Sequence, residues 1–219
     1  MQQSNGYVLA SNSGWGTPLV NIAPVGAADA AAGAFPLADP TSLDAASVMP
    51  LPVSAGGYTV QVKGKSGDSG IVLAEIYDAS VGGATASSIR LVNLSCLNYV
   101  PSGGALTAGF FIDGPSAETV LIRAIGPSLS GYGTPSPLPD PEVTLQPLGS
   151  NTLVASNTRW AGDTQIAAAA TAIGAFALPD PSSGDSAVLV TLAPGAYTAQ
   201  ITSAGGGAGN ALVEVYEVP

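Results

Sequence analysis

Alternation of apolar and polar residues predicts β-strands at several places along the chain. Residues 58–63 (YTVQVK) place apolar side chains at alternate positions, and residues 197–202 (YTAQIT) do the same. Such alternation is typical of a strand with one buried and one solvated face. Residues 119–125 (TVLIRAI) are apolar on both faces, which predicts a central strand that is covered from both sides.

The middle of the chain predicts further strands separated by turns and loops. Turn-forming residues at 66–70 and 203–207 separate strand-like segments, and the Pro-rich stretches 135–141 and 178–181 are predicted to be ordered loops. The strands expected between about residues 89 and 150 are 89–97, 106–112, 119–125 and 143–146.

Two short Ala-rich helices are also predicted. Asp163 or Thr164 can cap a helix over residues 165–173, and a counterpart spans about residues 27–32. A glycine follows each segment and can end the helix. We expect both helices to pack flat against a sheet.

The chain contains an internal repeat, because four sequence blocks occur twice in the same order. The blocks at residues 8–15, 33–40, 57–62 and 70–77 recur at residues 153–160, 174–181, 196–201 and 209–216. Their nearly constant offset excludes chance, whereas residues 89–150 have no earlier counterpart. We therefore predict a complete repeat unit over residues 80–219 and, over residues 1–79, the second half of another unit.

These patterns together predict an all-β protein of the β-sandwich or jelly-roll-like class, with one full and one partial copy and a short Ala-rich helix in each. A half-sandwich leaves an apolar face and unpaired strand edges. In one resolution, residues 1–79 and 86–150 form a hybrid domain. In the other, a neighbouring molecule supplies the missing strands, and such head-to-tail pairing does not close on itself and builds a filament.

The charge content narrows the possible partners. Charged residues make up 9% of the chain, and 15 acidic against 5 basic residues give a net charge of −10. Ordinary soluble domains contain about 25% charged residues, so extensive dry interfaces are favoured here. Nucleic acid is excluded as a partner because phosphate neutralisation needs clustered cations. The five cations are Lys63, Lys65, Arg90, Arg123 and Arg159, of which only the lysines lie close together in the sequence.

Membrane insertion is not expected either. The longest nearly apolar run, residues 166–178, is too short to span a bilayer, and attachment to anionic lipid lacks the necessary cations. No apolar signal core follows Met1, so we expect that a signal has been removed or that the chain is a piece of a longer protein.

Candidate catalytic residues are few. The chain has no His, and its one cysteine, Cys96, lies in an apolar strand-like stretch that predicts a buried, inert thiol. Glu75 and Glu214 could form a glycosidase-type pair of carboxylates in strands, but they are equivalent by repeat, which favours a structural role. Residues 64–66 (GKS) match the end of a phosphate-binding loop, yet Thr59 stands where its first glycine belongs, so a hairpin turn is favoured.

Candidate binding residues also have structural interpretations. Trp15 and Trp160 could stack on sugar rings, but they too are equivalent by repeat, and a core or loop-anchoring role is favoured. Asn12, Asn157 and Asp163 could offer oxygen ligands to calcium, although a helix cap and turns explain them without metal. We predict no catalytic, cofactor-binding or metal-binding residue and interpret the chain as a non-enzyme.

Two groups of segments resemble known families. Residues 143–157 and 192–201 resemble bacterial pre-peptidase C-terminal domains, which are small β-sandwich modules attached to secreted proteins. Residues 90–95, 120–129 and 211–216 resemble repeats of large surface and secreted proteins from Verrucomicrobia-like bacteria. The resemblance implies an extracellular or cell-surface β-sandwich with an adhesive or structural role and supplies no catalytic residue.

Three functions follow from these observations. The first is a structural subunit of an extracellular filament, assembled head-to-tail from copies of this chain by strand complementation. The second is a non-catalytic adhesion or carbohydrate-binding module of a larger secreted protein, with polysaccharide or the cell surface as partner. The third, an enzyme or enzyme accessory, would require converging carboxylates in a deep pocket. No cofactor is expected in any of them.

Overall fold

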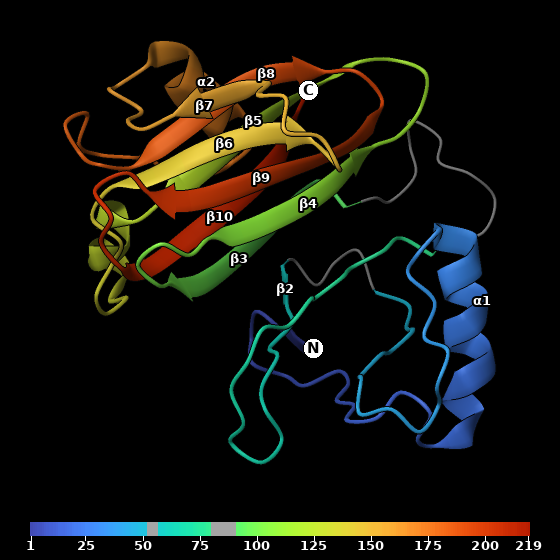
Figure 1. Ribbon diagram of the computed structural model, residues 1–219. Helices are drawn as coiled ribbons and strands as arrows, with labels where there is room; N and C mark the ends of the chain where they lie inside the picture. The colour runs from blue at the N-terminus through green and yellow to red at the C-terminus, as the bar shows by residue number, and fades with distance from the viewer. Residues whose placement is uncertain (52–56, 80–90) are drawn as a thin grey trace. The chain divides into compact units, whose positions relative to one another are not determined.

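The computed structural model describes residues 1–51, 57–79 and 91–219. The chain divides into two compact units, Met1–Leu91 and Val92–Pro219, here called unit 1 and unit 2 (Figure 1). The boundary expected between residues 79 and 80 adjoins residues outside the described ones, so that division stays a prediction. The first two residues of the strand expected at 89–97 also lie outside the described residues.

Unit 2 is a β-sandwich of two antiparallel four-stranded sheets, which confirms the predicted fold class (Figure 1). Sheet 1 contains, in spatial order, β3 (Asn93–Val100), β10 (Gly209–Val218), β5 (Glu118–Ile125) and β8 (Ser186–Leu192). Sheet 2 contains β4 (Leu106–Ile112), β9 (Gly195–Ser203), β6 (Pro141–Pro147) and β7 (Ala155–Asn157).

Strands from the two halves of the repeat alternate in both sheets. We call residues 92–150, which contain β3 to β6, the first half, and residues 151–219, which contain β7 to β10, the second half. Strand β10 pairs with β3 and β5, β8 with β5, β9 with β4 and β6, and β7 with β6. Within unit 2, every ladder therefore joins one strand of each half, and neither half contains a ladder of its own.

This pairing rules out the hybrid domain. The strands of the first half pair with residues of the second half, and not with residues 1–79. The hybrid alternative is therefore wrong for this structure.

The main core lies between the two sheets. Alternate residues of the central strands point inward, so Ile122 and Val213 of sheet 1 join Val143, Leu145 and Ile201 of sheet 2 in one buried cluster. Four of these five side chains have no exposed surface, and Val213 is 1% exposed. Both halves contribute to this core, so its burial stabilises the unit only when the halves are together.

A second core covers the outer face of sheet 1. Helix α2 (Thr164–Ala172) packs Ile166 and Ala170 over Leu121 and Ile125 of β5. This covering confirms that β5 is buried on both faces. Asp163 caps the helix as predicted, since its Oδ1 accepts hydrogen bonds from the backbone N–H groups of the first turn. The short 3₁₀ helix η3 (Pro127–Tyr132) follows β5.

Unit 1 forms almost no sheet among its described residues. Its strands are β1 (Gln2–Gln3) and β2 (Tyr58–Thr59), which pair with each other. The strand predicted at residues 58–63 is thus reduced to two residues, and residues 70–77 form none, so both expectations are wrong. The reason is topological, because the equivalents of these segments in unit 2, β9 and β10, pair with first-half strands that have no counterpart in residues 1–79.

Apolar residues of unit 1 are exposed where their equivalents in unit 2 are buried. Val62 is 52% exposed, whereas its equivalent Ile201 is 0% exposed. Val72 is 61% exposed against 0% for Ala211. The same sequence pattern therefore creates a core only where first-half strands are present.

The helix of unit 1 lacks the packing predicted for it. Helix α1 (Ile22–Ala32) follows the 3₁₀ turn η1 (Leu19–Asn21) and ends at Gly33, which has a left-handed conformation. Among its residues only Val25 is buried, whereas α2 buries three residues. The expectation that this helix lies on a sheet is wrong because the described part of unit 1 contains no counterpart of sheet 1.

The alternation of halves predicts that neither half of unit 2 folds alone. Isolated fragments 92–150 and 151–219 should each give the circular dichroism spectrum of an unfolded chain, and an equimolar mixture should recover the spectrum of a β-sandwich. A mixture in which the first fragment carries Ile122→Asp is the control, because a carboxylate in the core prevents recovery. A β-spectrum from either fragment alone would contradict this topology.

Candidate functional site

A buried ion pair links the two halves of unit 2. Arg123 on β5 and Glu214 on β10 lie directly opposite each other in the ladder. The Nε and Nη2 atoms of Arg123 donate to Oε2 of Glu214 at 2.8 and 2.5 Å. Arg123 is 0% exposed and Glu214 4% exposed, so both charges are removed from water and depend on each other.

Two aromatic residues and a carbonyl complete the surroundings of the arginine. Nη1 of Arg123 donates to the backbone oxygen of Phe176 at 2.5 Å, and its guanidinium carbon lies 4.3 Å from the Phe176 ring centroid. The ring centroid of Tyr216 is 5.7 Å away, and its hydroxyl donates to Oε1 of Glu214 at 2.8 Å. We call Phe176, Glu214 and Tyr216 the arginine receptor. It belongs entirely to the second half, whereas Arg123 belongs to the first.

The receptor changes the acidity of its tyrosine. Burial, followed by the hydrogen bond to Glu214 and the negative charge of that carboxylate, raises the pKa of Tyr216 to about 12. The hydroxyl thus stays protonated, and continues to donate to the carboxylate, to a higher pH than an ordinary tyrosine.

A second acid of the second half holds the turn after β5. Oδ1 of the buried Asp185 accepts from the backbone N–H groups of Gly126 and Ser128 at 2.8 and 3.3 Å. Its Oδ2 accepts from the hydroxyls of Ser128 and Ser183 at 2.5 and 2.8 Å. A Cβ at position 126 would lie 2.0 Å from the Leu138 oxygen, so this turn requires glycine. The arginine receptor and Asp185 together bind residues 123–128 of the first half, which have the sequence Arg-X-X-Gly-Pro-Ser.

A tryptophan anchors the loop that carries this acid, and the loop occurs in both units. Trp160 donates from Nε1 to the oxygen of Asp180 at 3.0 Å and from its backbone N–H to the oxygen of Asp185 at 2.8 Å. Trp15 makes the equivalent bonds to Asp39 and Asp44 at 2.9 and 2.7 Å. Both indoles are buried, which confirms the core and loop-anchoring role. A buried indole offers no open face for a sugar ring.

The loops of the two units also share their side-chain hydrogen bonds. Oδ1 of Asn157 accepts from the backbone N–H of Ala187 at 3.3 Å, and Oδ1 of Asn12 accepts from Ala46 at 3.2 Å. These contacts agree with the predicted turn role of the two asparagines. Among the described residues, no group of three or more His, Cys, Asp or Glu side chains is arranged to hold a metal ion.

The acids that begin these loops have matching environments. The hydroxyl and backbone N–H of Thr41 donate to Asp39, and those of Ser182 donate to Asp180. These bonds stabilise the carboxylates and lower the pKa of Asp39 and of Asp180. These loop hydrogen bonds therefore recur in both units, and Asp44 of unit 1 occupies the loop position of Asp185.

Unit 1 contains a counterpart of the arginine receptor without an arginine. The hydroxyl of Tyr77 donates to Oε1 of Glu75 at 3.0 Å, as Tyr216 does to Glu214. Phe35, the equivalent of Phe176, is 70% exposed, and Glu75 and Asp44 are exposed as well. In the described parts of the chain, neither carboxylate lies within ion-pair distance of a cation.

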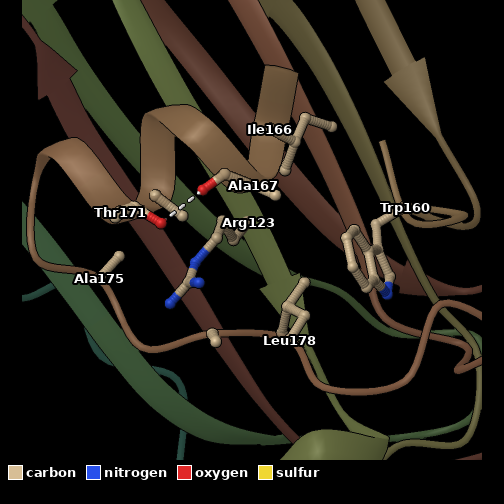
Figure 2. Close-up of a pocket in the computed structure, with 9 residues that line it drawn as sticks. Arg123, Trp160, Ile166, Ala167, Thr171, Ala175 and Leu178 are labelled. Carbon is tan, nitrogen blue, oxygen red and sulfur yellow. Dashed lines mark hydrogen bonds between the residues drawn. The ribbon is translucent and has the colours of Figure 1, made fainter. Parts of the chain in front are cut away.

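A small pocket lies beside the arginine of unit 2 (Figure 2). Its volume is about 90 Å³, and Trp160, Thr171 and Leu178 are among its walls. Ligand pockets usually measure about 300–1,000 Å³, so a sugar ring or a larger substrate does not fit. Arg123 lines this pocket, and its charge is already paired with Glu214.

Two other sequence candidates have ordinary surroundings. Cys96 is exposed, so the predicted buried thiol is wrong; it lies on β3, one of the two edge strands of sheet 1. Partial desolvation nevertheless raises the pKa of this thiol, which weakens it as a nucleophile. Residues 64–66 form an exposed turn, in which Gly67 N–H donates to the oxygen of Gly64 at 3.3 Å.

The arginine receptor and Asp185 were not predicted from the sequence, although the sequence contains a signal for the first. Arg123 is the one charged residue in a segment that is apolar on both faces. A buried cation needs a buried anion, and Glu214 is the one acid in the strand-like run at residues 211–216. The hydrogen bonds of Asp185 depend on backbone geometry and have no such signal.

Comparisons with solved structures add a structural likeness. No protein-family model matches the chain, and no curated protein matches it either. The pre-peptidase C-terminal domain of collagenase from Bacillus anthracis is similar over 57% of this chain and 89% of its own, with 13% identity and a TM-score of 0.35. The β-sandwich assignment rests on the two sheets of unit 2, and the resemblance to Verrucomicrobia-like repeats stays a prediction.

Within the described residues no helix has the length and apolar character needed to cross a bilayer.

The ion pair predicts that removing the Glu214 side chain destabilises the protein far more than removing that of Glu75, its equivalent by repeat. Glu214→Ala should lower the free energy of unfolding of unit 2 by about 3–5 kcal/mol, because it leaves the charge of Arg123 buried and unpaired. The matched control, Glu75→Ala, should change stability by less than about 0.5 kcal/mol because Glu75 is exposed. Urea denaturation followed by circular dichroism measures both, and equal effects would contradict the assigned role of Glu214.

The raised pKa of Tyr216 predicts a loss of stability in alkali. The unfolded tyrosine ionises near pH 10 and the folded one near 12, so the contribution is complete below pH 10 and is lost as pH rises through 12. Tyr216→Phe should therefore show a shallower fall in unfolding free energy between pH 10 and 12 than the natural chain. Identical slopes in this window would show that Tyr216 does not titrate as described.

Proposed function

We propose that this chain is a non-catalytic structural repeat module of a secreted or cell-surface protein, and that a first half from outside residues 1–219 completes unit 1. One observation carries the proposal. Every ladder of unit 2 joins a first half to a second half, and residues 1–79 repeat only the second half. The segments at 58–63 and 70–77 thus have the sequence of central strands and lack their neighbours.

The hydrogen bonding of the buried acids supports a structural role. Glu214 is occupied by Arg123 and Tyr216, and Asp185 accepts four hydrogen bonds from its own unit. Carboxylates saturated in this way maintain the fold and are not available as acid or base. The carbohydrate-binding alternative gains nothing from the tryptophans, because both indoles are buried.

The missing partner must be larger than one strand. In unit 2, β9 and β10 each have first-half strands on both sides, and they lie in different sheets. Completing residues 58–63 and 70–77 in the same way requires strands in both sheets. The expected donor is therefore an entire first half, which recruits backbone hydrogen bonds in both layers.

The number of first and second halves in the chain decides whether copies of it alone can build the proposed filament. A donor that is another copy would make a head-to-tail contact that extends without closing, and a homopolymer would follow. However, residues 1–79 and 151–219 are two second halves, whereas residues 92–150 are one first half. A copy donates its first half only by withdrawing it from its own unit 2. We therefore favour a donor that carries an additional first half, with a head-to-tail filament as the resulting assembly.

Light scattering on a mixture of the full chain and fragment 92–150 tests the complementation. We expect a 1:1 complex with increased β-content, and no complex with a control chain that lacks residues 1–79.

Negative-stain microscopy of the full chain alone tests self-donation, for which uniform fibres are expected. Monodisperse particles would remove the homopolymer, and failure of the fragment to bind would contradict the complementation itself.

A further inference from the structure

We infer that unit 1 contains a site for one particular strand sequence, an arginine followed by Gly-Pro-Ser at the spacing Arg-X-X-Gly-Pro-Ser. The occupant is the β5-type strand of a donor first half from outside residues 1–219. This inference rests on the proposed function, since it names the element of the donor that unit 1 recognises. It is argued from the counterparts in unit 1 of the groups that hold Arg123 and the turn after it.

The carboxylate of the site is already oriented. In unit 2, Tyr216 holds Oε1 of Glu214 while Oε2 accepts both bonds from Arg123. In unit 1, Tyr77 holds Oε1 of Glu75 at 3.0 Å, and no described residue donates to its Oε2. Glu75 thus presents to a partner the same oxygen that binds arginine in unit 2.

The aromatic wall of the site is positioned by the end of α1. Phe35 stands two residues after Gly33, and Phe176 stands two residues after Gly174. Both glycines are left-handed, with φ of 66° and 72°, so the chain leaves each helix in the same way. Phe176 packs on the guanidinium of unit 2, whereas Phe35 is 70% exposed.

The second acid is held by its loop. The backbone oxygen of Asp44 accepts from Trp15 N–H at 2.7 Å, and its Oδ2 accepts from the Ser42 hydroxyl at 2.9 Å. Asp185 makes the same two contacts. Its Oδ1 then accepts from the backbone N–H groups of the Gly-Pro-Ser turn. Among the described residues, no group donates to Oδ1 of Asp44.

Charge and shape together select arginine. Glu75 and Asp44 are acidic, so the site favours a cation. The receptor in unit 2 uses three donor atoms of one guanidinium on two acceptors, and stacks it on an aromatic ring. A planar, multiply donating group satisfies this arrangement, and the point charge of a lysine does not. Arg123 begins the one Arg-X-X-Gly-Pro-Ser sequence of residues 1–219 and is already bound in unit 2, so the donor brings a second such sequence.

The arginine would also join two separate segments. Arg123 connects the carbonyl of Phe176 to the carboxylate of Glu214, which lie on different segments of the second half. Phe35 and Glu75 are separated in the same way along unit 1. Binding of the strand therefore brings these segments together and begins the completion of the unit.

The experiment measures binding of fragment 92–150, in natural form and as Arg123→Met and Arg123→Lys, to the full chain by titration calorimetry. Both substitutions should weaken binding by at least about tenfold, because each leaves acids of the site without their proper partner. Glu75→Gln in the full chain should cause a similar loss, and its effect should largely disappear with the Arg123→Met fragment. The matched control is Asp68→Asn, an exposed acid in a turn of unit 1, which should leave binding unchanged.

The outcomes separate this inference from the proposed function. Binding of the natural fragment with equal affinity for the Arg123→Met fragment overturns the arginine site and leaves complementation intact. Failure of the natural fragment to bind overturns both. The free fragment contains no ladder of its own, so its variants do not depend on prior folding. Circular dichroism of the Glu75→Gln and Asp68→Asn chains checks that the receptor side is unchanged.

Discussion

Hydrogen bonding between the two halves of the repeat is the constraint on which the structure depends. In each sheet of unit 2, strands of one half lie beside strands of the other. Both the ladders and the main core therefore form only when the halves meet, which makes folding of the unit cooperative and non-local. The same rule explains why residues 1–79, which repeat only the second half, contain a single two-residue strand pair among those described.

The polar contacts follow the same division. The second half provides Glu214, Tyr216 and Asp185, and the first half provides Arg123 and the turn at Gly126. A buried ion pair contributes little net stability compared with apolar packing, but it strongly disfavours any arrangement in which one partner is missing. The pair thus selects which strand lies beside β10, and this selectivity is what unit 1 would use to recognise a donor.

Much of the fold was predictable from periodicity, and the errors have physical causes. Strands at 106–112 and 119–125 were correctly predicted because their patterns reflect burial within one unit. Residues 58–63 have the same alternation as 197–202 yet form only two residues of strand, because strand formation depends on neighbours that a local pattern does not reveal. Cys96 is exposed because it lies on an edge strand, and edge position also depends on topology.

The central claim is that the two copies of the second half differ in structure because only one of them has first-half strands beside it. Hydrogen exchange measured by mass spectrometry on the monomeric chain tests it most directly. The account predicts rapid exchange of the amides at residues 60–63 and 70–77, and strong protection at residues 199–202 and 209–216. Equal protection of both sets in a monomer would show that unit 1 completes its own sheets, and would contradict the account.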